Sequence, residues 1–204
     1  MQSFNAGTKI YVRGWNSRFT NDDIVVSLVC DKPTYVYGNI LSTLDGDNFR
    51  TIHYLPLDDS IDPSEAWGEF AGFFNYYDFS QKYNKILSHP TKELTIPIES
   101  TFSMGTFNNM FEGCTLIEQA PYIVVDEIGV RPVNSNTVFG YMFDGCSNLS
   151  YIRTYTFLTE TETTGWVRNV STNGTFVTDL PDRFTRGNNG IPTNWQVIKK
   201  ENID

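Results

Sequence analysis

The sequence predicts a β-rich solenoid of the α/β class, in which each unit contributes one short parallel strand and one helical turn. Two observations carry this prediction: an eight-residue phrase that occurs twice, and short strand-like segments between and around its copies. The phrase reads Phe-x-x-Met-Phe-acidic-Gly-Cys at 107–114 and again at 139–146, which is 32 residues further on. Self-similarity at a period of this size is typical of stacked structural units.

Within each copy the apolar residues follow the spacing i, i+3 and i+4, which places their side chains on one face of a helical turn. The glycine before each cysteine suits the left-handed conformation that ends a helix, and the following cysteine and leucine suit the start of a buried strand. A weaker copy with the same aromatic spacing lies at 70–76. The predicted repeat core consists of Phe107, Met110, Phe111, Gly113, Cys114, Leu116, Phe139, Met142, Phe143, Gly145, Cys146 and Leu149.

Short segments rich in β-branched and aromatic residues alternate with these turns. One short strand per unit, returning through a turn, builds a parallel sheet on one side of a right-handed coil. The main rival is an antiparallel sandwich built from the first 60 residues, because that stretch lacks the Met-Phe phrase. The predicted parallel strands lie near Ile10, Tyr35, Leu94, Tyr122, Tyr151, Thr175 and Gln196.

The domain prediction is a single solenoid over residues 1–204. Its N-terminal rungs occupy 1–60, the Met-Phe-x-Gly-Cys repeats occupy 61–165, and a C-terminal cap occupies 166–204. The polar stretch at 45–67 is interpreted as an insertion or a joint. No charge run or low-complexity linker marks a second domain.

Composition restricts the partners. The chain has 15 Lys and Arg against 24 Asp and Glu, a net charge of −9, which disfavours nucleic acid and anionic membranes. Aromatic residues make up 15% of the chain, more than a minimal core requires, so we expect some rings to line a contact surface. The first residues lack the basic start and apolar run of a secretory signal. The sequence therefore predicts a protein made in the cytosol and not inserted in a membrane.

The residue types that usually carry chemistry show no suitable spacing. Cys30, Cys114 and Cys146 lack a Cys-x-x-Cys pair, and His53 and His89 fall in no ligand or triad pattern. We therefore expect no catalytic residue, no metal site and no cofactor. The cysteines of the two repeats are expected to be buried free thiols, because stacked helical turns separate their backbones by about 10 Å.

The acidic residue of each phrase, Glu112 or Asp144, raises the question of paired-carboxylate chemistry. The two occupy equivalent repeat positions on the predicted turns. A solvent-facing role, or one that complements the helix dipole, is therefore the favoured interpretation.

The Met-Phe-x-Gly-Cys-x-x-Leu phrase resembles that of the BspA-like leucine-rich repeat family, which occurs in surface proteins of gut Bacteroidota and in proteins of their phages. Residues 10–16 and 37–40 are similar to the opening rungs of that family, and 165–195 contains stretches similar to its closing segment. The chain departs from the family in having only two clear copies, longer units and an acidic insertion. The resemblance implies a binding or structural role and supplies no catalytic residues.

These observations favour a non-enzymatic phage virion component, such as a head decoration, fibre or tail-associated protein, made in the host cytoplasm. Its expected partners are other virion proteins, a host surface receptor or a polysaccharide, in a homo-oligomer or a larger assembly. The alternatives are a bacterial cell-surface or secreted leucine-rich-repeat adhesin, and a polysaccharide-active enzyme or carbohydrate-binding module. Open strand edges at the two ends of the stack make Tyr11, Trp15 and Trp195 the candidate docking residues.

Overall fold

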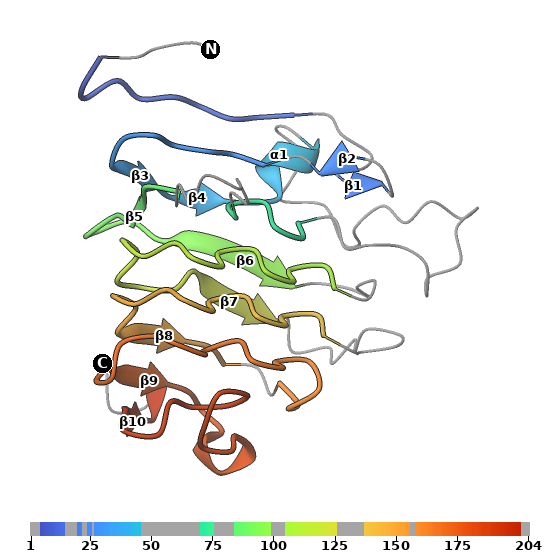
Figure 1. Cartoon of the computed structure of the whole chain (residues 1–204), viewed down its shortest axis with the longest axis vertical. Coiled ribbons are helices and arrows are strands. Elements are labelled where there is room, and N and C mark those ends of the chain that lie inside the picture. The colour runs from blue at the N-terminus through green and yellow to red at the C-terminus, as the bar shows by residue number, and fades with distance from the viewer. Residues whose placement is uncertain are drawn as a thin grey trace.

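The structure is a computed structural model built mostly from short strands, with almost no helix (Figure 1). It describes residues 5–14, 20–21, 24–25, 27–45, 70–75, 84–98, 105–125, 137–155 and 158–200. Within these ranges the helical elements are α1 (Ser42–Asp45) and the 3-10 turn η2 (Pro181–Arg183).

The strands are two to five residues long, and β6 to β10 lie one beneath another in chain order along the long axis of the molecule (Figure 1). They are β1 (Thr20–Asn21), β2 (Ile24–Val25), β3 (Thr34–Val36), β4 (Gly38–Asn39), β5 (Ile86–Ser88), β6 (Leu94–Ile98), β7 (Tyr122–Val125), β8 (Tyr151–Arg153), β9 (Thr175–Val177) and β10 (Gln196–Ile198).

Parallel pairing dominates the sheets. β3 pairs with β5, the order β4-β6-β7 forms a second sheet and β8-β9-β10 forms a third, all with parallel neighbours. Parallel bridges from Gln119 to Tyr151 and from Ile123 to Thr154 connect the β7 and β8 rungs. Only the short β1-β2 pair is antiparallel among the described strands.

Short parallel strands are confirmed at six of the seven predicted places. The prediction near Ile10 is wrong, because the described residues 5–14 contain no strand and the Ile10 side chain is 54% exposed. A strand forms only where a neighbouring backbone completes its hydrogen bonds, and β3 and β4 take β5 and β6 as their partners instead. The sequence analysis also missed β5.

The Met-Phe phrases form chains of successive turns rather than the predicted helical turns. In the first copy every second N–H group, such as those of Met110 and Glu112, donates to the carbonyl three residues earlier. The N–H groups between them, such as those of Asn109 and Phe111, donate to carbonyls of the second copy. A helix would use all these N–H groups within its own segment. Half of the backbone donors therefore join one unit to the next.

The same alternation links four segments in order. We call them the turn segments, and they cover 70–75, 105–114, 137–146 and 161–170. The N–H groups of Phe74, Phe111 and Phe143 each donate to the following segment at 2.9 Å. The fourth segment carries Trp166 and Val167 where the second copy carries Met142 and Phe143, so it lacks the phrase that identifies the others.

Burial along the turn segments repeats every four residues. The backbone has a positive φ at Asn109 (55°) and Gly113 (73°), and likewise at Tyr141 (52°) and Gly145 (75°). Such a φ at the third position of a turn is typical of type II turns and favours Gly or Asn. Between these positions two consecutive side chains point inward, so the spacing i, i+3 and i+4 arises without a helix.

The inward side chains stack from segment to segment. Phe107 lies between Phe70 and Phe139, with ring centroids 5.7 and 5.5 Å away and nearly parallel ring planes. A second column runs through Phe74, Phe111, Phe143 and Trp166, with centroids 4.9, 5.6 and 6.0 Å apart. These rings are buried and form the centre of the hydrophobic core.

One apolar position of the predicted repeat core is displaced. Leu149 is fully buried, but Leu116 is only half-buried, and the residue equivalent to Leu149 is Ile117, which is buried. Both buried residues follow the cysteine by three positions and continue the inward pattern of the turns. Leu116 follows its cysteine by two positions and falls on the outward side.

The repeat cysteines lie closer to the neighbouring segment than stacked helices would allow. Backbones joined by hydrogen bonds lie about 4.8 Å apart, so the expected separation of about 10 Å is wrong. The thiols of Cys114 and Cys146 donate to the carbonyl oxygens of Phe74 and Phe111, at 3.4 and 3.0 Å. Both cysteines are buried free thiols, as expected, although the reason differs.

Replacing Phe111 or Phe143 with alanine should lower the free energy of unfolding by about 3–5 kcal/mol, because each substitution opens a cavity between two stacked rings. Urea denaturation followed by circular dichroism measures the change. Tyr11→Ala is the matched control, since that ring is 79% exposed, and its effect should stay within about 0.5 kcal/mol. Equal effects for the buried and the exposed ring would contradict the stacked core.

The native protein should protect its repeat cysteines from alkylation. Burial raises the pKa of Cys114 far above that of a free thiol, with Cys30 adding to the shift. Burial likewise raises the pKa of Cys146. Because the thiolate is the reactive form, iodoacetamide at neutral pH should label half-buried Cys30 first. Mass spectrometry identifies the labelled sites, and all three should react in guanidinium. Rapid labelling of Cys146 in the native protein would argue against its burial.

Candidate functional site

The strands present a row of tyrosines on the outer side of the sheets. Side chains alternate along a strand, and in β8 this alternation buries Ile152 and Thr154 while Tyr151, Arg153 and Tyr155 face outward. β7 follows the same pattern around its buried Ile123. We call the resulting surface the tyrosine face, defined by Tyr35, Tyr37, Tyr122, Tyr151 and Tyr155.

Arg153 holds the centre of the tyrosine face. Its guanidinium carbon lies 3.9 Å from the centroid of the Tyr122 ring, a cation–π contact. Its Nη2 donates to both carboxylate oxygens of Glu93 at 2.6 Å. Tyr122 also meets Tyr155 edge to face, with centroids 5.6 Å apart. The ion pair and the rings therefore fix one another's positions across neighbouring rungs.

A loop at 89–93 projects onto the same face. Val36 pairs with Ser88, whereas Gly38, only two residues later, pairs with Leu94. The intervening residues 89–93 have no counterpart in the neighbouring strand and must bulge out of the sheet. Insertions of this kind in repeat proteins often lie on the binding face.

Aromatic contacts attach this loop to β3 and to Tyr37, which follows β3 directly. The His89 ring meets Tyr35 and Tyr37 edge to face, with centroid distances of 5.3 and 4.9 Å. The Nδ1 atom of His89 accepts the backbone N–H of Thr91 at 3.1 Å, which leaves the ring proton on Nε2 in the neutral form. Lys92 Nζ lies 4.5 Å from the centroid of Tyr37.

The tyrosine face is shallow, and the pKa values of two of its tyrosines are raised. A cavity beside the loop has a volume of about 20 Å³, with His89 and Lys92 among its lining residues, and such a volume holds no more than a water molecule. Burial raises the pKa of Tyr122 and of Tyr151 against the opposing effect of Arg153, so both hydroxyls stay protonated at neutral pH.

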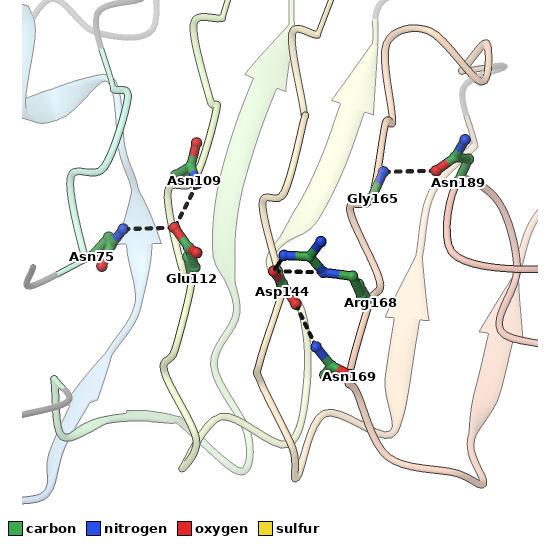
Figure 2. Close-up of polar contacts among 8 residues, drawn as sticks. All are labelled: Asn75, Asn109, Glu112, Asp144, Gly165, Arg168, Asn169 and Asn189. Carbon is green, nitrogen blue, oxygen red and sulfur yellow. Dashed lines mark hydrogen bonds and ion pairs between the residues drawn. The ribbon is translucent and has the colours of Figure 1, made fainter. Parts of the chain in front are cut away.

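The opposite side of the units carries two separate polar clusters on the turn segments (Figure 2). Glu112 accepts hydrogen bonds from Asn75 at 3.0 Å and from Asn109 at 2.5 Å. Asp144, at the equivalent position one segment further on, turns instead toward Arg168 and Asn169. The two carboxylates thus bind donors on opposite sides and do not share a site.

The expected solvent-facing role is wrong for Asp144, which is only 4% exposed. It accepts the Nε–H of Arg168 at 2.9 Å and the amide of Asn169 at 3.0 Å. These donors come from the turn segment that lacks the Met-Phe phrase, so the pairing was hidden from sequence reasoning. The remaining contact in Figure 2 joins the Gly165 N–H to Asn189 Oδ1 at 2.8 Å.

The candidate docking residues have different environments. Tyr11 is strongly exposed on the extended segment 5–14. Trp195 is 2% exposed, and its indole N–H donates to the Ser171 carbonyl at 2.8 Å, so its ring belongs to the core and offers no docking surface. Trp15 lies outside the described residues.

Asp144→Ala should lower the free energy of unfolding by about 1–3 kcal/mol, the usual cost of losing hydrogen bonds to a buried charged acceptor. The control is Glu118→Ala, which removes an exposed carboxylate and should change stability by about 0.5 kcal/mol or less. Urea denaturation compares the two variants. If they were equally stable, the contact between the third and fourth turn segments would contribute nothing.

Among the described residues, no three His, Cys, Asp or Glu side chains gather in an arrangement suited to a metal ion. In that same part of the chain, no helix has the length and apolar character needed to span a bilayer. Comparison with protein-family models, with curated proteins and with solved structures finds no match to this chain.

Proposed function

We propose that this chain is a non-enzymatic binding or structural protein, a single leucine-rich-repeat solenoid that presents its tyrosine face to another macromolecule. The observation that carries the proposal is the row of outward tyrosines held in place by Arg153 and by the 89–93 loop. Tyrosine and arginine are the residue types that dominate binding energy at interfaces. A surface this ordered and this aromatic is suited to recognition.

The solenoid part of the proposal is supported by the repeated order of elements. Strands β7, β8 and β9 each follow a turn segment, and turn segments and strands both join their successors through backbone hydrogen bonds. Each unit thus contacts mainly its neighbours, as in repeat proteins.

A binding role fits the tyrosine face better than catalysis. The face is open and its adjoining cavity is too small for a substrate. Glu93, a carboxylate beside the central rings, accepts both hydrogen bonds from Arg153. Both of its oxygens are thus bound to a guanidinium, so this carboxylate holds the structure of the face.

The proposed setting is a phage virion, made in the host cytoplasm, where the protein contacts other virion components or a host surface receptor. The resemblance of the Met-Phe-x-Gly-Cys phrase to repeats of Bacteroidota surface proteins and their phages supports this setting. A bacterial cell-surface adhesin of the same repeat type is the second candidate, and it would use the same face.

Light scattering tests the proposal by comparing the mass of the chain in solution with the 23.3 kDa of one copy, alone and together with products of neighbouring genes. We expect masses above the monomer and no turnover of polysaccharide or ester substrates. Tyr37→Ala with Tyr122→Ala should reduce the mass gained when a partner of the tyrosine face is added, whereas Val29→Ala, which removes an exposed side chain near the turn segment 70–75, serves as the control. A strictly monomeric protein with a hydrolytic activity that disappears when one carboxylate is changed would refute the proposal.

A further inference from the structure

We infer that the tyrosine face binds a linear acidic polysaccharide, an inference that rests on the proposed binding function and names the chemical class of its partner. The ligand would lie along the stack and cross the rungs from β3 to β8. Four features of the face lead to it: local charge, exposed rings, linear extent and shallow relief.

The first feature is the local charge. The chain as a whole carries a net charge of −9, yet the tyrosine face presents three basic residues, Lys92, Arg153 and Lys200, against two carboxylates, Glu93 and Asp179. Arg153 is neutralised by Glu93. The ammonium groups of Lys92 and Lys200 instead lie 4.5 Å from the Tyr37 and Tyr155 centroids, with no carboxylate partner in the described part of the chain. An acidic ligand is therefore attracted to this face and repelled by most of the remaining surface.

The second feature is the character of the rings. Tyr35 is 54% exposed and Tyr37 is 39% exposed, so parts of both rings remain open to a ligand. The apolar C–H face of a sugar ring packs on an aromatic ring, while sugar hydroxyls and carboxylates need nearby donors. The protonated hydroxyls of Tyr122 and Tyr151, together with the two lysines, supply such donors on the same face.

The third feature is the linear extent of the face. Its tyrosines lie on the rungs of β3, β7 and β8, with the 89–93 loop between the first two. Adjacent rungs are about 4.8 Å apart, close to the length of one sugar residue in an extended chain. A linear polymer can therefore contact successive rungs with successive sugars, and weak contacts add up along its length.

The fourth feature separates a polysaccharide from a protein partner. Cores of protein interfaces are depleted in Lys and Glu, and their hot-spot residues fill desolvated pockets. Here Lys92, Glu93 and Lys200 stand among the rings, and the aliphatic side chains beside them, Leu87 and Leu94, are half-buried in the sheet. The shallow relief also excludes a small free sugar, because the adjoining cavity of about 20 Å³ cannot enclose one.

Affinity electrophoresis and calorimetry with polygalacturonate, alginate and hyaluronan test the inference, with dextran as the neutral polymer. We expect binding to at least one acidic polymer and none to dextran. Lys92→Gln with Lys200→Gln should weaken binding at least tenfold at low salt and reduce its salt dependence. Tyr37→Ala with Tyr122→Ala should weaken it at both low and high salt.

Lys9→Gln with Val29→Ala is the matched control, because it removes one charge and one exposed apolar side chain that lie outside the tyrosine face. It should bind like the unchanged protein, and circular dichroism verifies that each variant is folded. Failure of all three acidic polymers to bind, or equal loss in the control and the face variants, would overturn the inference. Loss of assembly in the face variants without polysaccharide binding would identify the face as a protein interface, which overturns the inference and leaves the proposed function intact.

Discussion

The fold depends on backbone N–H groups that alternate between local hydrogen bonds and hydrogen bonds to the neighbouring segment. In the turn segments one N–H closes a local turn and the next reaches the neighbouring segment, so each backbone folds itself and attaches its successor at the same time. Buried backbone donors must be paired, and neither half of this arrangement satisfies all of them alone. The close spacing that results brings phenylalanine rings and cysteine thiols into register from one segment to the next.

The spacing of the phrase predicted the stacked units but not their backbone conformation. Residues spaced like Phe107, Met110 and Phe111 would share one face of a helix with 3.6 residues per turn. The same spacing fits the inward pairs of a four-residue turn repeat, which is what the structure has. Burial alone cannot separate the two periods over so short a stretch. The sequence signal that distinguishes the turn repeat from a helix was the choice of Asn at 109 and Gly at 113. Both residue types accept the left-handed conformation that the backbone adopts there.

Only those parts of the candidate site that follow from the inward and outward alternation of side chains along a strand could be predicted from the sequence. The outward position of Tyr122 follows from the strand pattern of β7, and the excess of aromatic residues indicated a contact surface. The pairing of Arg153 with Glu93 joins residues 60 positions apart, so no local pattern announces it. For Trp195 the local pattern was misleading, because a large ring near an open strand edge suggested a docking residue. The ring instead lies in the core, where its N–H donates to the Ser171 carbonyl.

The variable distance between turn segments has a consequence for how the protein can change. Phe70, Phe107, Phe139 and Thr163 occupy the same place in successive segments, yet the chain between them differs in length. The alternating backbone hydrogen bonds that join the segments do not depend on the identity of the side chains. The entropy of closing a longer connection rises only logarithmically with its length. The connections are thus positions at which evolution or a protein engineer can insert foreign peptides while the stack of rings stays in place.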